Sequence, residues 1–596
     1  MDVIYVGKDN VKRDAILKSH DTVILLLFDR WDDFDYKTSF PTYCQINGRE
    51  VELPALKILI KDQMTSFSYF DELVSKGWDG VFPIKDLSYI SNPEDITFYE
   101  LIDGHLGSDA AIKVAEVLCD ASYMVHILED SNSMELVSSN GFKKSLQRER
   151  GSIKAFLDGW RALNGEGISI GNMLFRFRTF GGDIQPLSLN FSTVSPLPHD
   201  INVLIGPNGI GKSQALIQIV DDWLRLNPNE KNETGFEKEP NINQIVVVSY
   251  SPFELFPIDS EVVDRESGNE RKDHDVYRYF GLRTYETQTP PDGKEIKKIR
   301  LSRQWPHLNA AYSLILCLED DRKYGAIKNW SNKVATLYSV LKNAIDFDDI
   351  AIGVSGFEDK SQLFESGPWL VDDSFIHSFI HSFIHSFIPA DAIIDGNGQP
   401  EAYIPIRSDR IDEPNTKRLR EFLHVRTGII FLKDGSPIKL SSGQRLFSYM
   451  VTNILGAIRR NSLILIDEPE LFLHPTLEIA FIQMLKKILR NYASKALLAT
   501  HSLVTVRELP RHCVHVFERT NDSLFINHPP FETFGGDIQR ISSYVFGDKS
   551  VSKPFEAWLR EKLEEYGSAK ELIEALGDNI NEEMLIQIHA MAEDKW

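Results

Sequence analysis

The residues with the clearest chemical potential lie in a glycine-rich loop between an apolar strand and an apolar helix. The strand-like run Ile201–Ile205 enters the loop, and the apolar pattern over residues 215–220 predicts a helix after it. Glycines let several backbone N–H groups point at one phosphate, and the helix N-terminus adds partial positive charge. The spacing GxxxxGK[ST] therefore predicts a phosphate-binding loop, with the Lys212 ammonium on the β- and γ-phosphates and the Ser213 hydroxyl on Mg²⁺. The loop consists of Gly206, Pro207, Asn208, Gly209, Ile210, Gly211, Lys212 and Ser213.

A pair of carboxylates follows a second strand-like run. Residues 462–466 are apolar, and Asp467 and Glu468 come directly after them. Two buried carboxylates without a cation would be costly, so a neighbouring Mg²⁺ explains them better than an acidic surface turn does. We predict that Asp467 holds the Mg²⁺ shell and that Glu468 polarises the attacking water as a general base.

A short serine- and glycine-containing loop lies about 25 residues before the carboxylate pair. It reads Leu440 and then Ser441, Ser442, Gly443 and Gln444, and a helical pattern follows. This loop resembles the LSGGQ signature of the ABC ATPases, with Ser442 in place of the first glycine. The resemblance implies that the loop binds the γ-phosphate across a dimer interface, so that two copies of the chain enclose each ATP.

Further segments resemble the same family in the same order. Residues 497–502 form a strand-like run that ends at His501, the position of the family's switch histidine, although a capped strand end would look similar. Residues 470–475 resemble the D-loop of the RecF, SMC and OLD branches. The glutamine that the family places after the strand 245–250 is missing, and Ser251 or Glu254 is a candidate to replace it. For stacking on adenine, Phe175, Phe177 and Phe180 all stay open.

The combination of motifs over residues 168–550 resembles the stand-alone ATPases of bacterial antiviral systems, of the Septu type and its retron-associated relatives. Members of that group act with a separate HNH nuclease, so the resemblance implies a nuclease partner. A RecF-like DNA-repair ATPase and a transporter ATP-binding subunit are the alternatives. The repair alternative would use a local basic run, although such runs are usually solvated. This run comprises Lys294, Lys297, Lys298, Arg300 and Arg303.

The length of 596 residues predicts at least two domains, and the strand and helix patterns together with the ABC resemblance imply an α/β protein. We expect an N-terminal mixed α/β accessory domain over 1–165, an ABC-type P-loop ATPase domain over 166–540 and a helical tail over 541–596. Within the ATPase domain we expect a helical insert at about 255–438. The net charge of −22 argues against a basic surface for non-specific binding of nucleic acid.

Other features indicate the compartment. The four cysteines form no CxxC pair, and no apolar run or signal-peptide pattern indicates a membrane or export, so we expect a cytoplasmic protein. The repeat SFIHSFIHSFIHSFIP at residues 374–389 spaces His377, His381 and His385 four apart. Metal binding and a simple tandem duplication both fit this repeat.

Overall fold

The structure is a computed structural model of the full chain. It describes residues 1–29, 35–166, 169–192, 195–224, 233–258, 276–288, 296–303, 305–328, 330–354, 402–406, 419–420, 423, 428–520, 523–546, 554–577, 580 and 582–593. Contacts divide the chain into two compact units, Met1–Gly535 and Gly536–Trp596. Residues 1–165 thus share one unit with the ATPase domain. Among the described residues, no helix combines the length and the apolar character needed to span a membrane.

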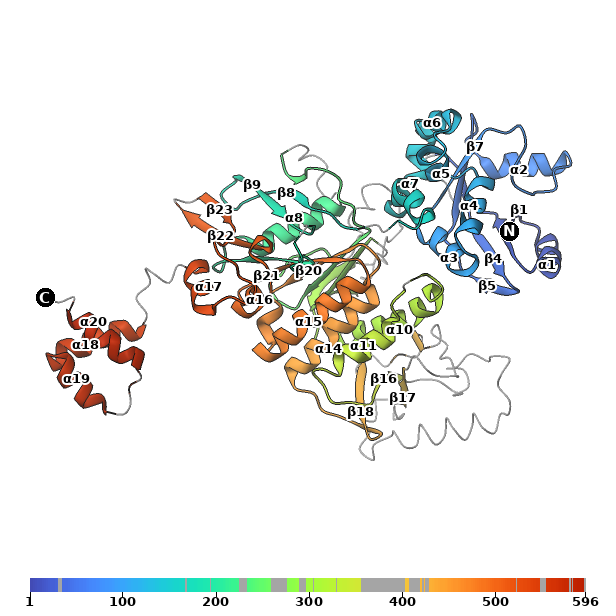
Figure 1. The fold of residues 1–596 in the computed structure, drawn as a ribbon. Coiled ribbons are helices and arrows are strands. Elements are labelled where there is room, and N and C mark those ends of the chain that lie inside the picture. Colours follow the sequence, from blue (N-terminus) through green and yellow to red (C-terminus); the bar gives the residue numbers. More distant parts are fainter. Residues whose placement is uncertain are drawn as a thin grey trace. The chain divides into compact units, whose positions relative to one another are not determined.

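A seven-stranded sheet forms the centre of the first unit, in the order β13-β12-β20-β21-β10-β22-β23 (Figure 1). Neighbouring strands are parallel, except that β23 pairs antiparallel with β22 at one edge. Strands β12, β20 and β10 are buried along their whole length, as expected for a parallel sheet covered on both faces. The strands are β13 (Tyr277–Gly281), β12 (Gln244–Ser249), β20 (Ser462–Asp467), β21 (Lys495–Thr500), β10 (Ile201–Ile205), β22 (Val514–Thr520) and β23 (Ser523–Asn527).

Helices cover both faces of this sheet (Figure 1). On one face, α8 (Lys212–Leu224) packs against alternate strand residues such as Val247 and Leu465. On the other face lie α14 (Ser442–Ala457) and α15 (Pro475–Asn491). Because parallel strands end at one common edge, the loops after β10, β20 and β21 all start there. The predicted phosphate loop, carboxylate pair and His501 therefore meet at this edge, which confirms the predicted α/β P-loop fold.

A small antiparallel sheet accompanies α8. Its strands are β11 (Gly235–Phe236), β8 (Met173–Arg178) and β9 (Ile184–Leu189), in the order β11-β8-β9. Phe175 and Phe177 of β8 are buried in the core that this sheet shares with α8.

The segment 255–438 is mixed, and our expectation of a helical insert is wrong for much of its described part. It contains the helices α10 (Trp305–Tyr324) and α11 (Lys333–Leu341), but also several strands. These strands form because short Ile- and Val-rich runs pair with one another, as β16 does with both β17 and β18. Besides β13 of the seven-stranded sheet, the strands of this segment are β14 (Arg283–Gln288), β15 (Ile296–Leu301), β16 (Asp349–Val354), β17 (Ala402–Pro405), β18 (Ile429–Lys433) and β19 (Ser436–Pro437). The SFIH repeat lies outside the described residues.

Residues 1–165 form the expected mixed α/β domain, and its core also includes Tyr324 and Ile327 at and just after the end of α10. One sheet has the order β1-β2-β4-β5 and the other the order β3-β6-β7. The strands are β1 (Asp2–Gly7), β2 (Val23–Leu27), β3 (Ser39–Phe40), β4 (Thr42–Ile46), β5 (Arg49–Val51), β6 (Leu56–Ile60) and β7 (Tyr89–Pro93). The helices are α1 (Asn10–Ser19), α2 (Ser66–Ser75), α3 (Thr97–Leu106), α4 (Ser108–Val117), α5 (Ala121–His126), α6 (Ser131–Val137), η1 (Phe142–Leu146) and α7 (Arg150–Leu163).

The second unit is helical, as expected. It begins with α17 (Ile538–Val545). The helices α18 (Pro554–Tyr566), α19 (Ala569–Leu576) and α20 (Glu582–Glu593) follow and share a small apolar core.

Candidate nucleotide-binding site

The phosphate loop joins the end of β10 to the first turn of α8. Gly206, Gly209 and Gly211 have φ angles of 156°, 71° and 110°, which L-residues with side chains rarely adopt. A Cβ at Gly206 would lie 2.5 Å from the Phe517 carbonyl oxygen, so no side chain fits there. Lys212 Nζ donates to two loop carbonyl oxygens, including that of Gly206 at 3.0 Å. The ammonium thus lies at the curl of the loop, where it could reach a bound phosphate.

The phosphate loop and the carboxylate pair are joined by a hydrogen bond. Ser213 Oγ donates to Asp467 Oδ1 at 2.8 Å, although the two residues are 254 positions apart. Burial raises the pKa of Asp467 to about 7, and the Ser213 hydrogen bond opposes that rise. A buried carboxylate held this close to a hydroxyl has the chemistry of a divalent-cation site.

A second hydroxyl supports that assignment. In the β12–β20 ladder Ser249 stands directly opposite Asp467, so both side chains leave the sheet on the same face. The Ser249 hydroxyl is buried and makes no hydrogen bond within the described part of the chain. Ser213, Asp467 and Ser249 thus offer oxygen donors of the kind that Mg²⁺ prefers, and the residues fit this ion.

Glu468 has an unusual backbone conformation for its residue type. Its φ and ψ angles are 49° and 55°, in the left-handed region that costs energy for any residue with a Cβ. A hydrogen bond from its backbone N–H to the Ala499 carbonyl oxygen (2.8 Å) holds it there. Strain of this kind tends to persist at functional sites. The Glu468 side chain is 29% exposed, so it remains within reach of water, whereas Asp467 is almost fully buried.

His501 lies between the lysine and this glutamate. Lys212 Nζ donates to His501 Nε2 at 2.8 Å, which places the imidazole proton on Nδ1. Burial, with Lys212 adding to it, lowers the pKa of His501 to about 4, and burial lowers the pKa of Lys212 to about 8. Because His501 is neutral, its 4.0 Å approach to Glu468 Oε1 is a polar contact rather than an ion pair.

Two carboxylates that the sequence analysis did not assign to the site position its histidine segment. Glu470, in the turn η3 (Pro469–Phe472), accepts a hydrogen bond from the His501 backbone N–H at 2.5 Å. Glu478 accepts a hydrogen bond from the hydroxyl of the next residue, Ser502. The available signal was that Glu470 follows the pair Asp467 and Glu468 within one short acidic stretch.

The signature loop lies on the surface and caps its own helix. Ser441 Oγ accepts from Gln444 N–H at 3.2 Å, and Gln444 Oε1 accepts from Ser441 N–H at 3.1 Å. This reciprocal capping box fixes the start of α14. Gly443 packs closely on η3, since a Cβ there would lie 2.9 Å from the Phe472 carbonyl oxygen. In the described part of one chain, no hydrogen bond or ion pair joins Ser441, Ser442, Gly443 or Gln444 to the phosphate loop.

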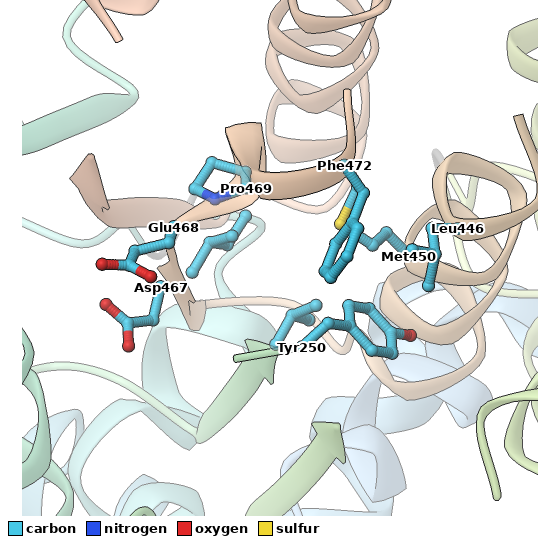
Figure 2. A pocket seen from close by; sticks show the side chains of 9 residues that line it. Tyr250, Leu446, Met450, Asp467, Glu468, Pro469 and Phe472 are labelled. Atoms are coloured by element: carbon cyan, nitrogen blue, oxygen red, sulfur yellow. The ribbon is translucent and has the colours of Figure 1, made fainter. Parts of the chain in front are cut away.

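A pocket behind the carboxylate pair connects it to α14 and η3. Figure 2 shows the carboxyl groups of Asp467 and Glu468 side by side at one end of this pocket. At the other end gather Tyr250, Leu446, Met450 and Phe472. The pocket thus lies between the signature helix and the carboxylate pair.

The two residues considered as replacements for the missing glutamine have local roles. Glu254 is buried and accepts hydrogen bonds from the Tyr279 hydroxyl, from Phe256 N–H (2.8 Å) and from Arg283 (3.2 Å). Ser251 Oγ accepts from a neighbouring backbone N–H in the same loop. These contacts fix the loop after β12 and leave the Ser249 hydroxyl in the better position beside Asp467.

Of the three phenylalanines considered for adenine, one is exposed. Phe180 is 67% exposed, whereas Phe175 and Phe177 are buried in the core. A Cβ built on Gly211 would lie 3.8 Å from the Phe180 ring, so this ring lies beside the phosphate loop.

The basic run predicted from the sequence lies partly outside the residues that the structure describes. Lys294 and the side chain of Lys297 lie outside the described residues, whereas Lys298, Arg300 and Arg303 are exposed on or just after β15. No further feature of the described residues marks a nucleic-acid groove here.

The parallel sheet, the phosphate loop, the carboxylate pair and the signature helix together define an ABC-type P-loop ATPase fold. A family model described as "AAA domain, putative AbiEii toxin, Type IV TA system" matches residues 332–507. That range includes the signature loop, Asp467, Glu468 and His501, but it begins after the phosphate loop.

One curated relative matches most of the chain. Protein ea59 of Escherichia phage lambda is 22% identical over 536 residues, which cover 87% of this chain and 85% of that protein. Among solved structures, an ATP-binding cassette of an ABC transporter in its ADP conformation is 12% identical and covers 65% of this chain and 97% of that chain, with a TM-score of 0.25. An SMC head domain from Thermotoga maritima is also 12% identical and covers 61% of this chain and 100% of that chain, with a TM-score of 0.21.

Proposed function

We propose that this chain binds ATP with Mg²⁺ and hydrolyses it to ADP and phosphate. The observation that carries the proposal is the convergence of three motifs that lie far apart in the sequence: Ser213 donates to Asp467, and Lys212 donates to His501. These contacts join the phosphate loop to the last residue of β20 and to the residue after β21, and Glu468 directly follows Asp467. Such an arrangement suits phosphoryl transfer to water.

Each site residue has a distinct role in this proposal. The loop backbone and Lys212 hold the phosphates of ATP, while Ser213, Asp467 and Ser249 would hold Mg²⁺, which neutralises phosphate charge when bound. Glu468 orients and polarises the attacking water, and its left-handed backbone aims the carboxylate. His501, neutral and with its backbone N–H held by Glu470, helps to position that water.

We further propose that two copies of the chain enclose each ATP. Ser441 and Ser442 of the signature loop are exposed, and the loop's hydrogen bonds among the described residues run within its own helix start and to Ala344, so its outward surface is available to a second copy. Leu471 and Phe472 of the adjacent η3 are 48% and 45% exposed. Apolar side chains this exposed beside a nucleotide motif favour a protein contact at this edge.

For the biological role, we propose the ATPase component of an antiviral defence system that acts with a separate nuclease. The motif resemblance supports this role, and the family description links residues 332–507 to a toxin–antitoxin context. A RecF-like repair role would need DNA-stimulated hydrolysis, and a transporter role would need a membrane permease as partner.

The test of ATP binding and assembly uses two variants. Lys212→Ala should lose ATP binding, because it removes the ammonium that faces the phosphates. Glu468→Gln should bind ATP and assemble into a stable dimer, measured as an ATP-dependent doubling of mass by light scattering. A Lys212→Ala chain with wild-type ATP affinity would contradict the site assignment, and a Glu468→Gln chain that binds ATP as a monomer would contradict the dimer.

Co-purification from the native gene neighbourhood tests the biological role. Recovery of a nuclease, with or without a reverse transcriptase and RNA, supports defence. A permease, or DNA-stimulated hydrolysis by the isolated chain, would replace that role with transport or repair.

A further inference from the structure

Two segments that start at the nucleotide motifs lead to residues 1–165. Helix α8 begins at Lys212 and reaches Trp223 near its other end, about 17 Å away. Helix α14 begins after its cap Ser441 and is about 23 Å long, and the loop that follows it and leads into β20 contains Arg460. The end of α8 and this loop contact the same N-terminal domain.

The end of α8 is held by Arg150. Arg150 Nη2 donates to the Trp223 carbonyl oxygen at 2.6 Å, and its guanidinium lies 3.5 Å from the centre of the Trp223 ring. Arg150 also pairs with Glu239, on the segment that leads into β12, at 2.7 Å. A cation is favoured at the C-terminal end of a helix, where the last carbonyl groups carry partial negative charge. Arg150 therefore makes specific contacts with the helix that carries Lys212.

The loop between α14 and β20 is held by a half-buried ion pair. Arg460 Nη1 donates to Glu100 Oε1 of α3 at 2.6 Å, and its Nη2 donates to the Lys328 carbonyl oxygen at 2.6 Å. The Glu100 and Arg460 side chains are only 16% and 30% exposed, so loss of either charge leaves the other poorly solvated. Helix α3 also touches the turn after α10, because a Cβ on Gly104 would lie 2.1 Å from the Ala326 carbonyl oxygen.

Arg150 and Glu100 belong to one stiff part of the N-terminal domain. Glu149, the residue before Arg150, accepts a hydrogen bond at 2.7 Å from Lys57, whose side chain is fully buried. Helices α7 and α3 are in direct contact, since a Cβ on Gly159 would lie 2.8 Å from the Tyr99 ring. A displacement of α3 and α7 would thus move the end of α8 and the loop after α14.

We infer that α3 and α7 act as a brace that fixes the relation between the phosphate loop and the signature loop, with Arg150 and Glu100 as positioning residues for ATP hydrolysis. This inference rests on the proposed ATPase function. It gives residues 1–165 a regulatory role, because a partner that binds them changes hydrolysis by moving the brace. Because the same contacts join the brace to α8, which begins at the phosphate loop, ATP binding is also expected to alter amide exchange in α3 and α7.

The first test separates positioning from simple stability. Arg150→Ala and Glu100→Gln should each lower kcat by about tenfold, within the range expected for coupling residues, while the Kd for ATP changes by less than about threefold. Arg150→Lys should recover part of kcat, because it keeps the charge but not the planar fork. The matched control is Lys323→Ala, which removes the exposed Lys323–Glu52 pair (2.7 Å) between the same two domains and should leave kcat unchanged. If kcat fell equally in Lys323→Ala and in Arg150→Ala, the brace proposal would be overturned.

The second test measures hydrogen exchange rather than turnover. In a Glu468→Gln chain, ATP should slow amide exchange in the phosphate loop and also in the first turns of α3 and α7. Adding Arg150→Ala, or Arg150→Lys if the alanine variant fails to fold, should weaken the response in α7. Protection of the phosphate loop without any change in α3 and α7 would overturn the brace and leave the ATPase proposal intact. Absence of protection at the phosphate loop would instead contradict the ATPase proposal.

Discussion

The Ser249 hydroxyl offers a test in which stability and function respond in opposite directions. Ser249 is 1% exposed, makes no hydrogen bond within the described residues, and stands beside Asp467 in the β12–β20 ladder. Removal of a buried hydroxyl without a partner should leave stability unchanged or raise it by up to about 1 kcal/mol. The same change removes an oxygen from the proposed Mg²⁺ shell, for which losses of about 10–100-fold in metal affinity or activity are typical.

The assay compares Ser249→Ala with wild type in two measurements. One is the Mg²⁺ concentration that gives half-maximal ATP hydrolysis, supported by direct binding of Mn²⁺ followed by electron paramagnetic resonance. The other is the urea midpoint of unfolding. The matched control is Ser91→Ala in β7, where another buried hydroxyl lacks a hydrogen bond in the described residues, far along the chain from the site motifs. An unchanged Mg²⁺ requirement in Ser249→Ala would refute the placement of this hydroxyl in the metal shell.

Two further predictions concern the Phe180 ring, which is the candidate for stacking on adenine, and the stability of the ATPase core. Phe180→Ala should raise the KM for ATP about tenfold through loss of stacking on adenine, with little change in melting temperature. Phe177→Ala, by contrast, should destabilise the core by about 3–5 kcal/mol. Equal KM values for wild type and Phe180→Ala would contradict a role of Phe180 in binding adenine. Burial, with His528 adding to it, lowers the pKa of His515 from 6.5 to about 3. Below about pH 6.5 this histidine is protonated in the unfolded chain but stays neutral in the folded chain. The free energy of unfolding therefore decreases as the pH falls from about 6.5 towards 3, and the decrease is about 2 kcal/mol at pH 5. In His515→Gln the drop in urea midpoint between about pH 7.5 and about pH 5 should shrink, and an equal drop in both proteins would contradict this account.

The local motifs of the site could be predicted from the sequence because each motif consists of residues that are adjacent in the chain. A phosphate loop such as Gly206–Ser213 must follow a strand and precede a helix, and a carboxylate pair such as Asp467 and Glu468 must lie at the end of a buried strand. The residue types and the flanking elements together therefore identify each motif. Parallel strands then bring both to one edge of the sheet. The P-loop fold follows from the same pattern.

Contacts between distant segments could not be predicted in this way. The bond of Glu470 to the His501 backbone and the orphan hydroxyl of Ser249 depend on how β12, β20 and β21 are ordered. No local spacing encodes the stacking of Arg150 on Trp223, since the two residues are 73 positions apart. The strands of the segment 255–438 were missed because short runs such as Ile429–Lys433 become strands only through pairing with distant segments.

The capping box gives the signature loop a structural role beside the nucleotide contact that we propose for it. Ser441 and Gln444 were predicted for their resemblance to a nucleotide-binding signature, and the structure shows both also closing the start of α14. A Ser441→Ala change would therefore cost helix stability as well as any phosphate contact, typically about 1 kcal/mol for the cap alone. A loss of hydrolysis in that variant has meaning only beside a measurement of its stability.

The most direct measurement of the central claim is phosphate release by wild type and Glu468→Gln at saturating ATP, with ATP binding measured separately on the same preparations. The account predicts equal binding and a rate lower by about 10²–10³ in Glu468→Gln, because the water loses its positioned carboxylate. A Glu468→Gln chain that releases phosphate at the wild-type rate would show that Glu468 is not the base.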